Sequence, residues 1–236
     1  MARPRIACFH GGGSSSAIYS IQCDQVLNLL KEFEFVFFDA PFERDAGPGV
    51  LPAFADEIYR PYRTWFRNRE DGTELNDGSG YAGPSDDGVE RVWEMMKAKG
   101  KGGDWVGAMG FSQGTRVVGG LLLDQQRRKE AGLPLPKGMI LKFGVLCMGG
   151  AAPMVSAMSR DGTGELDLIS IPTFHLHGLK DHNLENGRKQ LATYYDSKQT
   201  KLWEIDYHHA MPWFKEDVQG FVARFTEIAK DLKAIQ

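Results

Sequence analysis

The stretch 104–123 constrains the fold of this chain more than any other. It consists of an apolar segment, the pattern Gly110-Phe-Ser-Gln-Gly114, and a second apolar run at 117–123. Gly-x-Ser-x-Gly between a strand and a helix is typical of a nucleophile elbow, a sharp turn that lifts a serine hydroxyl above a sheet. Glycines flank the serine because a Cβ at either place would collide with neighbouring backbone. The pattern therefore predicts Ser112 as a nucleophile, provided that the chain supplies a base and an acid.

The surrounding pattern supports this interpretation over a chance match, which is common in glycine-rich chains such as this one, with 28 glycines among 236 residues. Apolar runs of strand length alternate with segments of helical periodicity. This alternation predicts the α/β class, with a mostly parallel, doubly wound sheet and helices on both faces, as in an α/β-hydrolase. We expect strands near 6–9, 34–39, 104–111, 139–148, 173–177 and 201–205, and helices near 18–30, 87–100, 114–131, 184–195 and 218–232.

Composition narrows the setting in which the chain works. Its length suits a single domain over 1–236, and its formal charge of −3 without a long basic run argues against nucleic acid or an anionic membrane as partner. The apolar runs are too short to span a bilayer, and the N-terminus lacks the apolar core of a signal peptide. Three widely spaced cysteines suit a reducing compartment. We therefore expect a soluble, cytoplasmic protein.

The glycine loop after the first strand, His10-Gly-Gly-Gly13 followed by three serines, admits three interpretations besides a plain turn. A Walker phosphate loop is excluded because no Gly-Lys-Ser/Thr follows. A dinucleotide loop is a partial match. Ser16 stands where its third glycine belongs, but Asp39 does end the next strand, where such a fold places an acidic residue for the ribose. An oxyanion loop fits best, because α/β-hydrolases present a backbone N–H to the substrate oxygen from a motif of this form.

The oxyanion interpretation assigns roles to specific residues. The backbone N–H groups of Gly12 and Gln113 would hold the substrate oxygen, and His10 and Gly11 would lie against the substrate. Downstream, about 40–83 forms an insert rich in proline and aromatic residues, which is unusually long unless it acts as a lid or pocket wall. Trp65 and Phe66 are its expected substrate contacts, suited to an apolar acyl chain, although these aromatics could equally seal a sheet edge.

The acid and base are expected at the ends of the last two strands. Asp181 follows the strand 173–177, at the carboxyl edge where sites of open α/β folds lie. His208 and His209 follow the strand 201–205, and the residues alone do not choose between them. With Ser112, the order serine, aspartate, histidine is that of an α/β-hydrolase.

A metal site is a weaker alternative. His175 and His177 would share one strand face, but no second pair at ligand spacing and no nearby cysteine accompanies them. We expect no metal, and the serine mechanism requires no cofactor.

The assembled motifs resemble the fungal serine hydrolase family, small α/β-hydrolases that include thioesterases and esterases of polyketide pathways in secondary metabolism. The resemblance extends over nearly the whole chain. The family's histidine motif is similar to Gly-Gly-His-x-x-Pro. Pro212 lies three residues after His209, so the resemblance selects His209 as the base. Tyr207 and His208 stand where the motif has its two glycines, and His208 is then an expected substrate contact. The matching stretches are Phe9-His-Gly-Gly-Gly, Phe38-Asp-Ala-Pro-Phe, Gly47-Pro-Gly-Val, Gly110-Phe-Ser-Gln-Gly, Phe143-Gly-Val-Leu-Cys, His175-Leu-His-Gly-Leu-Lys-Asp181 and His209-Ala-Met-Pro212.

The resemblance implies a serine hydrolase with Ser112, Asp181 and His209 as a triad. Its implied substrate is an acyl or polyketide thioester, presented on an acyl carrier protein or free, with a carboxyl ester or lactone of a small metabolite as the alternative. Two other classes stay open: a dinucleotide-binding protein that uses the early glycine loop, and a hydrolase fold without turnover.

Overall fold

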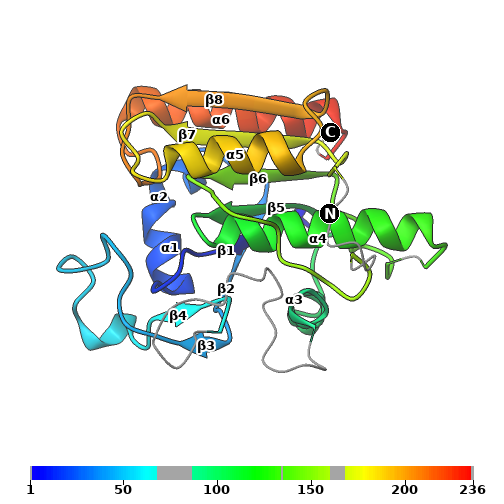
Figure 1. Ribbon diagram of the computed structural model, residues 1–236, viewed down its shortest axis with the longest axis horizontal. Helices are drawn as coiled ribbons and strands as arrows, with labels where there is room; N and C mark the ends of the chain where they lie inside the picture. Colours follow the sequence, from blue (N-terminus) through cyan, green and yellow to red (C-terminus); the bar gives the residue numbers. More distant parts are fainter. Residues whose placement is uncertain (1, 68–86, 134, 160–167, 235–236) are drawn as a thin grey trace.

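A six-stranded, all-parallel sheet organises the residues that the computed structural model describes, which are 2–67, 87–133, 135–159 and 168–234 (Figure 1). The strand order is β2-β1-β5-β6-β7-β8. This confirms the predicted α/β class. The strands are β1 (Arg5–Phe9), β2 (Glu34–Phe38), β5 (Trp105–Phe111), β6 (Phe143–Cys147), β7 (Thr173–Gly178) and β8 (Thr200–Ile205).

Helices cover both faces of this sheet, as predicted. Alternate residues of β1 enter different cores: Ile6 and Cys8 pack with Phe225 on one face, whereas Ala7 and Phe9 join the cluster on the other. The first face carries α1 (Ser16–Gln22), α2 (Asp24–Leu27) and α6 (Lys215–Asp231), and the second carries α3 (Gly88–Ala98), α4 (Gly114–Glu130) and α5 (Leu184–Tyr194) (Figure 1). Among the described helices, none combines the length and apolar composition that a membrane crossing requires.

The register of the sheet decides where the loops meet. Phe9 pairs with Gly110, Phe111 with Cys147, and Cys147 with Leu176. The carboxyl ends of these parallel strands therefore lie at one edge, where open α/β folds place their sites. The loops that follow β1, β5, β7 and β8 carry the residues predicted to act together.

Two predicted elements differ in extent. The helix expected near 18–30 is broken at Cys23 into α1 and α2. The strand expected over 139–148 is only Phe143–Cys147, because the backbone of Leu141 is bonded to a side chain of α4 instead of to the sheet: its N–H donates to Gln125 Oε1 and its carbonyl accepts from Gln125 Nε2, each at 2.8 Å.

The first part of the predicted insert is described and packs on the body of the molecule. It contains the antiparallel pair β3 (Phe42–Glu43) and β4 (Arg63–Thr64) and a short 3-10 helix, η1 (Glu57–Tyr59). Val50 and Tyr62 pack on Ile18 of α1. The remainder of the insert, 68–83, lies outside the described residues.

Candidate active site

Ser112 occupies a strained turn between β5 and α4, as the motif predicts. Its φ of +51° lies in the left-handed region, which costs a non-glycine residue roughly 1–2 kcal/mol. A Cβ on Gly110 would lie 2.3 Å from the carbonyl oxygen of Gly114, and one on Gly114 would lie 2.0 Å from that of Phe9. Neither place tolerates a side chain, so the two glycines allow the helix to start directly against β1 and β5.

Asp181 and His209 form a hydrogen-bonded pair at the same sheet edge. His209 Nδ1 lies 2.7 Å from Asp181 Oδ2, and the N–H of Asn183 donates to the other carboxylate oxygen at 2.7 Å. Burial by itself would raise the pKa of Asp181, but the bonds from His209 and Asn183 more than offset it and lower the pKa below its ordinary value. The carboxylate is therefore charged at neutral pH, and it orients the imidazole.

The ring of His209 packs over the end of β5. Its centroid lies 5.0 Å from that of Phe111, the residue that precedes Ser112. Since the imidazole bonds the carboxylate through Nδ1, that nitrogen carries the proton and Nε2 is an acceptor. The structure thus brings the three predicted residues to one edge of the sheet.

The histidine loop holds this position without the family's two glycines. Neither Tyr207 nor His208 has a positive φ, so the loop conformation does not need glycine. The Tyr207 hydroxyl accepts a hydrogen bond from the N–H of Trp213 at 3.0 Å, and its ring stacks on that of His208 with centroids 5.2 Å apart. Tyr207 is buried and His208 is exposed. A substrate contact by His208 stays a prediction.

The glycine loop lies directly against the elbow. The N–H of Gly13 donates to the carbonyl of Arg63 at 2.8 Å, so it serves the fold. A Cβ on Gly12 would lie 3.1 Å from Nε2 of Gln113, and one on Gly11 would lie 3.3 Å from Cβ of Ser112. A side chain at either position would therefore be tightly packed against the elbow. The contact with Gly12 is made by the side chain of Gln113, so the role of the backbone N–H groups of Gly12 and Gln113 as oxyanion donors stays a prediction.

The comparison with known proteins decides the family. A model of the family described as serine hydrolase (FSH1) matches residues 1–221. The chain belongs to the FSH1 serine hydrolase family. Over 96% of its length it is 34% identical to the esterase citA of Monascus ruber, of which the match covers 92%. It is 32% identical to the esterase claE of Penicillium crustosum, with 97% of this chain and 93% of that protein covered.

Solved structures agree with this fold. The acyl-protein thioesterase 2 of Zea mays matches with a TM-score of 0.57 and 15% identity, covering 97% of this chain and 94% of that one. A carboxylesterase from Mesorhizobium loti matches with a TM-score of 0.59 and 13% identity, and the match covers 96% of this chain and 90% of that one. At such identities the likeness shows the α/β-hydrolase fold alone. The family membership makes the chain a serine hydrolase, as the motifs predict.

One predicted substrate contact of this FSH1 hydrolase is corrected by its burial. His10 is fully buried: its Nδ1 donates to the carbonyl of Gly11 at 2.7 Å, and its Nε2 accepts from the N–H of Ala40 at 3.0 Å. Burial lowers the pKa of His10 to about 4. The neutral imidazole therefore joins the glycine loop to the segment after β2 and has no surface to offer a substrate.

Trp65 and Phe66 also lie in the core and not on the pocket wall. Trp65 Nε1 donates to the carbonyl of His10 at 2.9 Å, and Phe66 lies beneath the guanidinium of Arg116, whose Cζ is 3.7 Å from the ring centroid. Their side chains are at most 1% exposed. The sequence predicts the insert either as a wall of the substrate pocket or as a seal over the sheet edge. Trp65 and Phe66 fit the second interpretation, because their apolar surface is buried against the rest of the protein.

The side chain of Gln113 has a role that sequence reasoning missed. Its Oε1 accepts from the N–H of Trp65 at 2.9 Å and from the hydroxyl of Thr64 at 3.0 Å. It therefore ties β4 and the residue after it to the elbow. No sequence signal pointed to these two bonds, because they join Gln113 to residues that precede it by 48 and 49 positions.

Asp39, the acidic residue that favoured a dinucleotide loop, caps a helix. Asp39 Oδ1 accepts from the N–H of Ser16 at the start of α1, at 2.8 Å, while Ser15 Oγ accepts from the N–H of Ile18 at 3.3 Å. Asp39 thus stabilises the N-terminus of a seven-residue helix, where a negative charge is favourable.

Among the residues that the structure describes, one aspartate and two histidines lie close enough together to hold a metal ion. Asp181, His182 and His209 have ligand atoms within 4.8 Å of one another. A metal on Nδ1 of His209 would have to replace the 2.7 Å bond to Asp181. His175 and His177 are both buried, with ring centroids 6.2 Å apart. The expectation of no metal stays a prediction.

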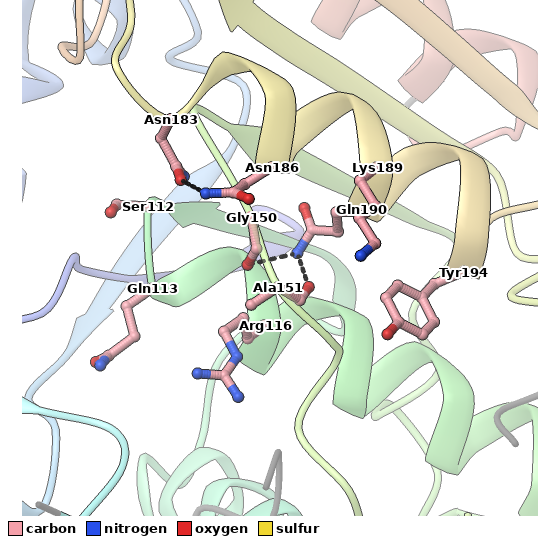
Figure 2. Close-up of a pocket in the computed structure, with 10 residues that line it drawn as sticks. All are labelled: Ser112, Gln113, Arg116, Gly150, Ala151, Asn183, Asn186, Lys189, Gln190 and Tyr194. Carbon is pink, nitrogen blue, oxygen red and sulfur yellow. Dashed lines mark hydrogen bonds between the residues drawn. The ribbon is translucent and has the colours of Figure 1, made fainter. Parts of the chain in front are cut away.

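A cavity of about 470 Å³ opens beside Ser112 (Figure 2). The start of α4, with Gln113 and Arg116, forms one wall, and α5 forms the other. Gly150 and Ala151 form the floor. The α5 wall consists of Asn183, Asn186, Lys189, Gln190 and Tyr194. Sequence reasoning missed this wall, because the helical spacing of its residues acquires meaning only when α5 is known to border the site.

Proposed function

We propose that this FSH1 hydrolase cleaves an acyl ester or thioester through a covalent acyl-enzyme on Ser112. The observation that carries the proposal is the 2.7 Å bond between His209 and Asp181, at the sheet edge where the elbow presents the serine. The bond fixes the tautomer in which Nε2 of His209 can accept a proton. Ser112 is then the nucleophile, His209 the general base, and Asp181 the residue that orients the base.

The reaction proceeds in two halves. Ser112 Oγ attacks the carbonyl carbon as His209 takes its proton, and the oxyanion is held by the N–H groups of Gly12 and Gln113. The loss of one such donor costs about 3 kcal/mol in the transition state. The imidazolium then protonates the leaving alcohol or thiol. Water, activated by the same imidazole, attacks the acyl-serine and releases the acid.

For the substrate, we propose a thioester of a polyketide or related acyl chain, presented on a carrier protein or free. The resemblance of the motifs to polyketide-pathway thioesterases supports it. A carboxyl ester or lactone of a small metabolite is the second candidate, and the curated relatives favour it, since those cited above are named esterases. A thiolate is the better leaving group, so a thioester relies less than an oxygen ester on proton donation by His209.

Labelling with a fluorophosphonate probe tests the nucleophile and the base. We expect the adduct on Ser112 by peptide mass spectrometry, no adduct in Ser112→Ala, and a severe loss of labelling rate in His209→Ala. His208→Ala is the matched control, because it removes an imidazole one residue away, and it should label at nearly the wild-type rate. Labelling that persists in Ser112→Ala, together with NAD(H) binding, would favour the dinucleotide-binding alternative. Labelled Ser112 without turnover of any ester would favour a hydrolase fold that does not act as an enzyme.

A matched substrate pair separates the two ester classes. The same acyl group is presented as an N-acetylcysteamine thioester and as an ethyl ester, and kcat/KM is compared. Faster thioester cleavage beyond the ratio of the two uncatalysed hydrolysis rates supports the thioesterase proposal. Faster turnover of the acyl group on a phosphopantetheinylated carrier protein than on N-acetylcysteamine supports a carrier partner.

A further inference from the structure

The cavity beside Ser112 is a groove between two helices that both begin at the catalytic edge. α4 starts directly after the elbow, and α5 starts after Asp181, so each helix leads away from the site (Figure 2). Gln190 Nε2 donates to the carbonyls of Gly150 at 3.1 Å and Ala151 at 2.8 Å, which fixes the floor. A substrate chain attached to Ser112 can therefore follow the groove between the helices.

The chemistry of the walls does not suit a purely apolar chain. Among the described residues that line the groove, no aliphatic side chain is larger than alanine, no acid is present, and two are cations, Arg116 and Lys189. Amide and charged groups lose solvation when an apolar chain covers them without replacing their hydrogen bonds. The expectation of an apolar acyl chain, which depended on Trp65 and Phe66, is therefore revised for this part of the site.

Lys189 is the cation best placed to meet a ligand. Its side chain projects from α5 between Gln190 and Tyr194 (Figure 2), and within the described part of the chain it has no ion pair. Its neighbour Arg188 differs, since it bonds Glu185 and Glu204 at 2.9 Å each. The ammonium of Lys189 is thus available to an anionic group in the groove.

Arg116 lies in the opposite wall, on α4. The residue is only 3% exposed, its Nε donates to the carbonyl of Ala152 at 2.8 Å, and its Cζ lies 3.7 Å from the ring centroid of Phe66. These contacts hold the guanidinium within the α4 wall and leave it almost no exposed surface, so Lys189 is the exposed cation of the described lining.

The position of Lys189 on α5 indicates which acyl chain lengths are worth comparing. At 1.5 Å of rise per residue, Lys189 is about 9 Å along α5 from Asn183, which lines the groove together with Ser112. An extended chain advances about 1.2 Å per bond, so this rise alone corresponds to roughly seven bonds. An anionic group that meets Lys189 therefore belongs at the distal end of an acyl chain and not beside the reacting carbonyl.

The groove receives the acyl part of the substrate and not the leaving group. A leaving group departs next to the imidazole that protonates it. His209 is absent from the residues that line this groove, whereas Ser112 is among them. The leaving group therefore lies on the His209 side of the serine, and the acyl chain lies between α4 and α5.

We propose, on the basis of the esterase or thioesterase function above, that the acyl group carries a distal carboxylate, which Lys189 binds in the α4–α5 groove. The substrate class is thus a monoester or monothioester of a dicarboxylic acid, or an acyl chain with an equivalent anionic end.

The test compares acyl groups that differ only in their distal end. p-Nitrophenyl monoesters of glutaric, adipic and suberic acids are set against alkanoyl esters of equal chain length, so that the leaving group is constant. For the wild type we expect a higher kcat/KM for the carboxylate-bearing ester at the best chain length, and a preference that decreases as salt is added. In Lys189→Gln this preference should fall about tenfold, in keeping with a charged hydrogen bond.

Matched variants make the result specific. Lys189→Arg should retain most of the preference, and Lys189→Glu should reverse it. Lys198→Gln removes the same charge from an exposed position in the turn after α5, and its preference should equal that of the wild type. Equal kcat/KM for charged and neutral esters in the wild type, or an unchanged preference in Lys189→Gln, would overturn the proposal.

Binding separates a failure of this inference from a failure of the proposed function. Calorimetry measures binding of the free dicarboxylate and of the matching monocarboxylate to Ser112→Ala. Stronger binding of the dicarboxylate that Lys189→Gln abolishes would support the anion site even if no ester is hydrolysed. Hydrolysis of neutral esters without any dicarboxylate preference or binding would refute the anion site and leave the hydrolase function intact.

Discussion

Nδ1 of His209 lies 2.7 Å from Oδ2 of Asp181, although the two residues are 28 positions apart and follow different strands. The bond joins the loops after β7 and β8, and the backbone N–H of Asn183 holds the carboxylate from the other side. The orientation of the imidazole is therefore set by the register of two neighbouring parallel strands.

Asp181→Asn should lower kcat/KM for a neutral ester by roughly 10³- to 10⁴-fold, because an amide neither stabilises the imidazolium nor enforces the Nδ1–H tautomer. Asp196→Asn is the control: it alters a carboxylate that accepts the N–H of Lys198 in a surface turn, and it should leave kcat/KM unchanged. A loss of less than tenfold in Asp181→Asn, measured with a folded variant, would contradict the role of Asp181.

Tyr207→Phe should loosen the histidine loop, since the variant lacks the hydroxyl that accepts the N–H of Trp213 at 3.0 Å. We expect a loss of about 1 kcal/mol in the free energy of unfolding and a lower kcat with little change in KM. Tyr59→Phe, in η1, is the matched control. If kcat is the same in Tyr207→Phe and the wild type, another contact must hold the loop.

Gly114→Ala should be among the most damaging single changes in the chain. Its Cβ would lie 2.0 Å from the carbonyl oxygen of Phe9, so β1 or α4 must move, and we expect a loss of at least about 3 kcal/mol or failure to fold. Gly49→Ala tests backbone strain alone, because Gly49 has a φ of +77° but nothing within 4 Å of its Cβ position. Urea unfolding should show a cost of only about 1–2 kcal/mol there. Similar midpoints for the two variants would refute the steric argument.

The stability of the protein should decrease between pH 7.5 and pH 5. Burial lowers the pKa of His10 to about 4 and that of His175 to about 3, whereas the unfolded value is 6.5. Below pH 6.5 the unfolded chain therefore binds protons that the native state does not, and each histidine should cost about 2 kcal/mol at pH 5.

Urea unfolding at both pH values measures this effect. His175→Gln should lose about 2 kcal/mol less than the wild type on acidification, whatever its stability at pH 7.5. The exposed imidazole of His208 serves as the control, and His208→Gln should show the full wild-type decrease. An equal pH dependence in His175→Gln and the wild type would mean that His175 does not contribute.

Patterns local in the sequence predicted much of this protein. The elbow around Ser112 follows from two glycines and the apolar runs that flank them. The order of the predicted catalytic residues along the chain follows from motifs that come directly after strands. The helix predicted near 87–100 is α3, and it begins next to Asp87, which accepts from the N–H groups of Val89 and Glu90 at 2.9 and 3.0 Å. Such features depend on neighbours within a few residues, which is why sequence alone predicts them.

Long-range packing decided the rest. His10, Trp65 and Phe66 have the composition of a binding site, yet only the tertiary structure shows that their surfaces are consumed by bonds and packing between β1 and the segment before residue 68. The polar wall of α5 likewise became part of the site because β7 lies two strands from β5 in the sheet. The sequence determined which groups can react, through the local turns and motifs that carry them. Which groups reach the substrate was decided by strand order and helix packing, because these bring together residues that are far apart in the chain.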